Sequence, residues 1–279
     1  MLRDITIGQY YDVESVVHKL DPRTKIIATV VYIVSLFCVK NILGFVLAGV
    51  GLLLAVKLAR IPLRFILRGL KTVMILLLFT VVLNVFLVDG TPIFKWYFIS
   101  ISREGIYTAV FMAARLILLI IGCSMMTLTT TPIQLTDGIE RLLRPLKKIK
   151  VPVHDIAMMM SIALRFIPIL MEETDKIMKA QTARGADFES GGLVQKAKSL
   201  IPVLVPLFIS AFRRADELAT AMEARCYHGD EGRTRMKELK YRARDQVAKL
   251  CLLVFLVGLI LSRYLPSVTS IGAFFLSKW

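Results

Sequence analysis

The chain has 279 residues, of which 56% are hydrophobic, and its 36 basic and 21 acidic residues give a formal net charge of +15. A composition this apolar excludes an ordinary soluble domain, so we predict an all-α, polytopic membrane protein. The basic residues flank apolar segments and no nucleic-acid-binding motif accompanies them. The charge therefore does not indicate a nucleic-acid partner.

The first elements are predicted from the polar N-terminal region and two apolar runs. Asp21-Pro22 is typical of a helix start, and Arg23 and Lys25 then lie at the membrane edge. Apolar runs follow at 26–39 and 42–56, separated by a tight turn. The next linker, residues 57–71, carries basic residues and no acid, which predicts a cytoplasmic position for it and for the N-terminus.

Three more spans are predicted, at 72–88, 105–128 and 246–265, which makes about five in total with the C-terminus outside. Between the third and fourth, Trp96, Tyr97 and Phe98 are typical of an aromatic belt at the membrane interface. Arg115 lies at mid-depth in the fourth span. It is either a functional group or a structural one, which bonds to backbone carbonyls or lies shallow enough for its side chain to reach the interface. The sequence leaves these possibilities open.

The predicted domain division follows from the distribution of charge. Residues 1–128 hold the N-terminal region and four membrane helices, 129–245 form a cytoplasmic region, and 246–279 hold the last membrane helix and an external tail. In the cytoplasmic region, two proline-containing apolar stretches at 156–171 and 200–212 are short for spans. We predict long helices there, each buried against the membrane bundle at one end and polar at the other.

Each of these helices leads into a copy of the same motif, Ala-x-x-Ala-Arg, and the two copies are 41 residues apart. In each copy an aliphatic residue, an alanine and the arginine share one helical stripe. The small residues Ala180 and Ala221 would allow a close helix crossing. The arginines stand in the predicted last turns, where their forked guanidinium groups suit a carboxylate on another protein.

Catalytic and cofactor motifs are absent from the sequence. No glycine is followed by lysine, so there is no Walker-type phosphate loop, and the three histidines belong to no catalytic motif. Cys226 and His228 are too few and too weakly spaced to predict a metal site. We predict a protein that is not an enzyme, with no cofactor and no metal.

The chain resembles the transmembrane T component of energy-coupling factor (ECF) transporters, the ABC-type importers of vitamins and trace metals in prokaryotic cell membranes. The resemblance covers nearly the whole length: Gly8-Gln9-Tyr10, the segment from His18 to Lys25, and both Ala-Arg motifs. The segment from His18 to Lys25 and the overall length are similar to the T components that are shared among several substrates.

The resemblance implies two kinds of protein partner: two ABC-type ATP-binding subunits and one substrate-binding membrane protein called the S component. Membrane lipid is a further partner, which the apolar spans themselves predict. It also implies that the motif residues couple the ATPases to the membrane. These residues are Ala183, Arg184, Gly185, Ala224, Arg225 and Cys226. Cys226 departs from the commoner glycine, so the second helix could end differently from the first.

Two other functions are weighed against this one. A stand-alone secondary transporter or channel would use Arg115 and Asn84 along its pathway, but the predicted spans contain no Asp or Glu to bind a coupling ion. A permease half of an ordinary ABC importer would need one coupling helix per chain. The doubled motif favours the ECF scaffold over both.

Overall fold

The computed structural model describes residues 10–39, 41–88, 92–96, 99–188, 192–229 and 239–264. The chain divides into two compact units. Among the described residues, we call those within 10–138 and 239–264 the bundle unit, and those within 139–229 the arm unit. Each is described by itself.

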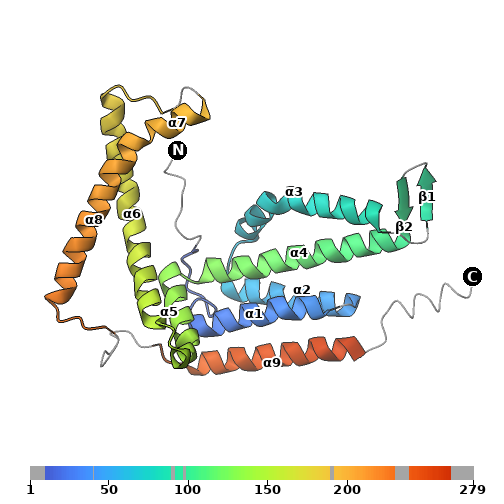
Figure 1. Cartoon of the computed structure of the whole chain (residues 1–279). Helices are drawn as coiled ribbons and strands as arrows, with labels where there is room; N and C mark the ends of the chain where they lie inside the picture. Colours follow the sequence, from blue (N-terminus) through green and yellow to red (C-terminus); the bar gives the residue numbers. More distant parts are fainter. Residues whose placement is uncertain are drawn as a thin grey trace, which may run out of the picture. The chain divides into compact units, whose positions relative to one another are not determined.

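Four helices of the bundle unit run alongside one another in Figure 1. They are α1 (Pro22–Cys38), α2 (Ile42–Ala59), α4 (Arg103–Thr129) and α9 (Ala243–Tyr264). Side chains cap the N-termini of two of these helices. Asp21 accepts a hydrogen bond from the Arg23 amide at the start of α1, and Ser102 accepts one from the Gly105 amide at the start of α4. These helices confirm the apolar segments predicted in this part of the chain.

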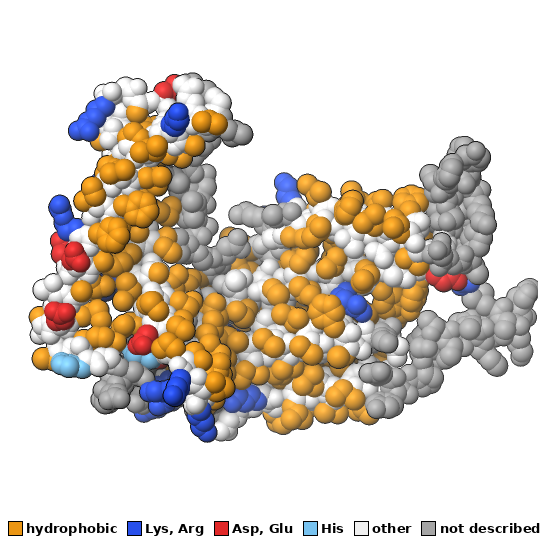
Figure 2. All heavy atoms as spheres, viewed as in Figure 1, with side chains coloured by type: hydrophobic (Ala, Val, Ile, Leu, Met, Phe, Trp, Pro, Cys, Tyr) orange, Lys and Arg blue, Asp and Glu red, His pale blue; other side chains and the backbone are white. Residues whose placement is uncertain are grey.

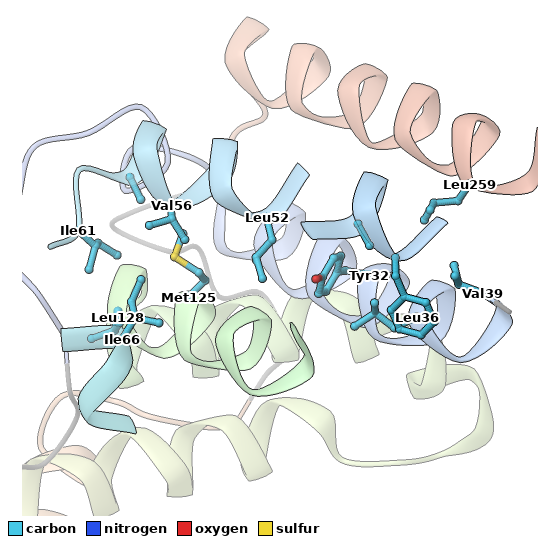
Figure 3. Packing of buried hydrophobic residues seen from close by; sticks show 13 residues of the cluster. Tyr32, Leu36, Val39, Leu52, Val56, Ile61, Ile66, Met125, Leu128 and Leu259 are labelled. Carbon is cyan, nitrogen blue, oxygen red and sulfur yellow. The ribbon is translucent and has the colours of Figure 1, made fainter. Parts of the chain in front are cut away.

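The core of the bundle unit lies where α1, α2 and α4 meet. Figure 3 shows Tyr32 and Leu36 of α1, Leu52 of α2 and Met125 of α4 along one continuous cluster of buried side chains. Leu36 is fully buried. Helices in lipid are held mainly by close packing and polar contacts, because lipid tails are as apolar as the side chains.

Two glycines allow this close packing. A Cβ atom built on Gly122 of α4 would lie 2.6 Å from the Tyr32 ring, and one built on Gly51 of α2 would lie 2.8 Å from the Phe255 ring of α9. The two rings stack on each other with their centroids 6.2 Å apart. Glycine thus lets two aromatic side chains fill the space between four helices.

The rest of the bundle unit comprises a bent helix and a hairpin. In α3 (Leu63–Leu87), the parts Arg64–Lys71 and Val73–Leu87 make an angle of 60°. Strands β1 (Pro92–Trp96) and β2 (Ile99–Ser102) pair antiparallel. The all-α framework is confirmed, but the hairpin was not predicted. Tyr97 and Phe98 of the predicted aromatic belt lie outside the described residues, as does the side chain of Trp96.

The arm unit is dominated by two long helices that cross each other, α6 (Val153–Ala183) and α8 (Ile201–Glu223) (Figure 1). Short helices lie beside them in sequence: α5 (Pro132–Leu143), which contains the boundary between the units, η2 (Arg144–Ile149) and α7 (Leu193–Ser199). Pro168 and Pro206 lie inside α6 and α8 without ending them. Each proline lacks a backbone N–H and so removes one hydrogen bond from its helix, which these long helices tolerate.

Among the described residues, five helices are long and apolar enough to cross a membrane, or six if the bent α3 is one span. The number agrees with the prediction of about five, but the set differs. The helix α1 has only 17 residues and falls outside it, whereas α6 and the segment Val194–Glu223 fall within it. Hydrophobic side chains cover most of the drawn face of the bundle helices, with few charged ones among them (Figure 2).

Candidate functional site

The first Ala-Arg motif forms the C-terminal end of α6. The Ala186 amide donates to the Gln181 carbonyl at 3.0 Å, and the Gly185 amide donates to the Thr182 carbonyl at 3.0 Å. Gly185 has a φ of +90°, in the left-handed region that favours glycine. These two hydrogen bonds and the left-handed residue define a Schellman motif, in which Arg184 directly precedes the left-handed residue.

The second motif forms the same turn at the end of α8. The Tyr227 amide donates to the Met222 carbonyl at 3.1 Å, and the Cys226 amide donates to the Glu223 carbonyl at 2.9 Å. Cys226 takes the left-handed position with a φ of +56°. The departure from glycine therefore leaves the hydrogen-bond pattern of the helix end unchanged, and Arg225 occupies the position that Arg184 occupies in the first motif.

Both arginines are exposed, and so are Ala183 and Ala224 beside them. In the described part of the chain, no hydrogen bond or ion pair joins either guanidinium group to another residue. Each tip thus presents an available cation on a turn that is fixed by backbone hydrogen bonds. Such a group suits bidentate binding of a carboxylate.

The two helices run antiparallel and bond to each other near their crossing. Arg214 of α8 donates to Glu173 of α6 at 2.7 Å, and Gln181 donates to the Pro202 carbonyl at 3.4 Å. Glu173 lies eleven residues before Arg184, and Arg214 lies eleven residues before Arg225. At 1.5 Å per residue, each tip is about 16 Å along its helix from this ion pair, on opposite sides of it.

The predicted crossing residues are Ala180 of α6 and Ala221 of α8. Ala180 and Ala221 are both exposed in the structure, so a close contact through them stays a prediction. The repeat indicates the Glu173–Arg214 contact, because these two residues are 41 positions apart, as the two motifs are, and so are equivalent positions of the two copies. Equivalent residues of two antiparallel copies meet where the copies cross.

The predicted membrane-edge motif forms a buried polar cluster in the bundle unit. Arg23 donates to both carboxylate oxygens of Asp21, at 3.0 and 2.9 Å. Burial alone would raise the pKa of Asp21, but hydrogen bonds from Arg23 lower it below its ordinary value. Pro22 occupies the first turn of α1, and the Lys25 ammonium group donates to the Thr129 carbonyl at 2.7 Å.

Sequence reasoning missed Asp245, which completes this cluster. Its carboxylate accepts hydrogen bonds from the Asp21 amide at 2.7 Å and from the Arg242 amide at 2.8 Å, and it is only 2% exposed. It therefore caps the start of α9 and joins it to the start of α1. The signal in the sequence was an acid in the first turn of the last helix.

Arg115 and Asn84, the polar residues that a stand-alone carrier or channel would use, both donate hydrogen bonds to backbone carbonyls. Arg115 donates to the carbonyl of Val39, the residue that ends α1, at 3.2 Å. Its guanidinium group also lies 5.7 Å from the centroids of Phe37 and Phe45. Asn84 donates to the Thr80 carbonyl of its own helix at 2.8 Å. The structure thus favours a structural role for Arg115 over a role in a transport pathway.

The Cys226 and His228 pair does not form a ligand set. The Nδ1 atom of His228 lies 2.8 Å from the Cys226 backbone carbonyl oxygen. Within the described ranges, no group of three or more His, Cys, Asp or Glu residues could hold a metal ion. The four cysteines are free, and Cys226 is exposed.

Known proteins identify the family. The family model CbiQ, described as cobalt transport protein, matches residues 13–236. A protein of Clostridium kluyveri named energy-coupling factor transporter transmembrane protein EcfT is 60% identical over 265 residues, covering 94% of this chain and 98% of the relative. The chain belongs to the EcfT family. An EcfT protein of Ruminiclostridium cellulolyticum is 56% identical, covering 95% of this chain and 99% of the relative.

The EcfT protein of Bacillus subtilis is 46% identical, covering 94% of this chain and 100% of the relative. Membership of the EcfT family confirms the resemblance to the T component of ECF transporters. The chain is therefore a non-catalytic, multi-pass membrane subunit of a bacterial transporter.

Proposed function

We propose that this EcfT chain is the scaffold through which two ABC-type ATP-binding subunits drive an S component that imports a vitamin or a trace metal. One ATPase binds the tip at Arg184 and the other binds the tip at Arg225. Hydrolysis of ATP moves α6 and α8 against each other, and this movement makes the S component release its substrate. The chain itself supplies position and connection, not catalysis.

The single observation that carries this proposal is the equivalence of the two tips. Arg184 and Arg225 are exposed, stand on the same turn and lie equally far from the Glu173–Arg214 ion pair. Two equivalent cations at opposite ends of a crossing fit two similar partners that each offer a carboxylate. A chain that worked alone would have no need of two such tips.

The proposed orientation places the N-terminus and the arm unit in the cytoplasm and the C-terminus outside. It is supported by the basic linker at 57–71 and by the charged second half of α6, where Glu173, Asp175 and Lys179 lie. We further propose that the T component is shared among several S components, on the basis of the segment from His18 to Lys25 and the overall length.

The competing function is a stand-alone carrier or channel with Arg115 in its pathway. The hydrogen bond from Arg115 to the Val39 carbonyl disfavours this function, because a guanidinium group bonded to the end of a helix is not available to bind a moving solute. The two tips would also have no role in such a protein.

Reconstitution separates the two functions. The chain is purified from its native membrane with its bound subunits, placed in liposomes, and tested for uptake of labelled vitamins and Co²⁺ with ATP, without ATP, and after removal of the bound ATPases. We expect uptake only when ATPases and ATP are both present. Uptake by the chain alone without ATP would contradict the scaffold and support the carrier.

A further inference from the structure

The segment from Asp21 to Lys25 contacts both places where the chain passes between the two units. These places lie between residues 138 and 139 and between residues 238 and 239. On the first side, Pro22 packs against Gly138: a Cβ atom built on Gly138 would lie 3.0 Å from the Pro22 Cβ atom. On the second side, Arg23 donates to the Leu239 carbonyl at 3.0 Å.

These contacts extend along both connections. Before the first, Lys25 donates to the carbonyl of Thr129, the last residue of α4. After the second, the Tyr241 ring contacts two cations, with Arg23 4.0 Å and Lys249 3.7 Å from its centroid. The start of α1 thus holds the end of α4 and the approach to α9 at the same time.

The holding contacts are buried and geometrically fixed. Asp21, Lys25 and Asp245 are 7%, 6% and 2% exposed. Arg23 is locked by its two hydrogen bonds to Asp21, and Asp245 locks the Asp21 backbone. Charge-assisted hydrogen bonds in a site with little water are strong, and closely packed interiors transmit displacement with little compression.

We infer that the segment from Asp21 to Lys25 is the joint that carries movement from the arm unit to the membrane helices. This inference rests on the proposed function. Any displacement that reaches Gly138 or Leu239 is passed to the start of α1, which Arg23 and Pro22 connect to them. The residues of the joint are therefore positioning residues for transport, and breaking the joint separates ATP hydrolysis from uptake.

Two variants test the joint, each with a matched control. Arg23→Met removes the bonds to Asp21 and Leu239, and Lys19→Met removes a cation from an exposed pair with Glu14 close by in sequence. Gly138→Ala pushes a methyl group against Ile26 and Pro22 in the first turns of α1, whereas a Cβ atom on Gly49 would be 3.8 Å from its nearest neighbour, so Gly49→Ala is the control. Three quantities are measured for the full complex: bound subunits, the rate of ATP hydrolysis, and uptake.

We expect both joint variants to bind the ATPases and hydrolyse ATP like wild type, while uptake per ATP hydrolysed falls at least about fivefold. Both controls should keep the wild-type ratio. If these residues had a merely structural role, assembly, ATP hydrolysis and uptake would fall together, and the uptake per ATP hydrolysed would stay unchanged. That result would overturn the inference, and so would wild-type uptake in both joint variants. If the Arg23→Met complex does not assemble, the uptake per ATP hydrolysed by the Gly138→Ala complex tests the inference. Wild type without ATP-driven uptake would instead overturn the proposed function.

Discussion

Glu173 and Arg214 hold the same position in the two copies of the repeated element, and they form an ion pair with each other at 2.7 Å. Two antiparallel helices can pair equivalent residues only at the point about which they are related by a two-fold rotation. The ion pair thus marks a local two-fold centre of the arm unit. From this centre the two arginine tips, Arg184 and Arg225, extend by equal lengths.

Reversing the ion pair tests this crossing. Glu173→Arg alone and Arg214→Glu alone each place like charges together, so both should lower the thermal stability of the purified chain. The double variant should recover it, with a coupling free energy of about 0.2–1 kcal/mol because the pair is partly exposed. Unfolding midpoints in detergent provide the double-mutant cycle. If the double variant loses the sum of the two single losses, the residues do not pair.

Exchanging the left-handed residues tests whether the two tips are the same turn. Gly185→Cys should be tolerated, because Cys226 stands at the equivalent position, and Cys226→Gly should stabilise the second helix end. The expected change is about 1–2 kcal/mol in each direction, since a side chain in this conformation costs that much. Amide hydrogen exchange of the last turn of α6 and α8 measures it. Slower exchange in Gly185→Cys would be incompatible with the turn described.

Arg115 should act in stability and not in transport. Arg115→Leu removes the bond that closes α1, which should lower the stability of the bundle by about 1–3 kcal/mol. Arg115→Lys keeps a cation and should lose less. Uptake by the assembled complex should remain dependent on ATP in both variants. A change in which solute is taken up, with stability unaltered, would return Arg115 to a transport pathway.

Much of this fold could be predicted from the sequence, since long apolar segments between charged ones define the helices directly. The repeat predicted the two tips, because each copy carries its own arginine and helix end. The contacts of Asp245 and Arg115 could not be predicted in the same way. Asp245 reaches across 224 residues of sequence to Asp21, and Arg115 meets a carbonyl 76 residues away, so both depend on how the helices pack.

Acidification should destabilise the bundle unit through His18. Burial lowers the pKa of His18, and the nearby Lys25 charge lowers it further. The unfolded chain therefore binds a proton at a higher pH than the folded chain does, and stability falls as pH decreases through about 6.5 toward the folded pKa. His18→Gln should show a smaller loss between pH 7 and pH 5. An equal loss in both proteins would remove His18 as the cause.

The central claim is that Arg184 and Arg225 each bind one ATPase. The most direct measurement is a pull-down in detergent of wild type, Arg184→Glu, Arg225→Glu and the double variant, with bound subunits quantified by mass spectrometry. Lys176→Glu is the control, because it reverses an exposed charge on α6 about 12 Å before the first tip. All five proteins should be present in the membrane in similar amounts.

Wild type and Lys176→Glu should each retain two ATPases. Each single tip variant should lose one of them, at a cost of about 2–5 kcal/mol in binding, and the double variant should lose both. Two ATPases bound to the double variant at the wild-type ratio would contradict the account, since the tips would then be ordinary helix ends.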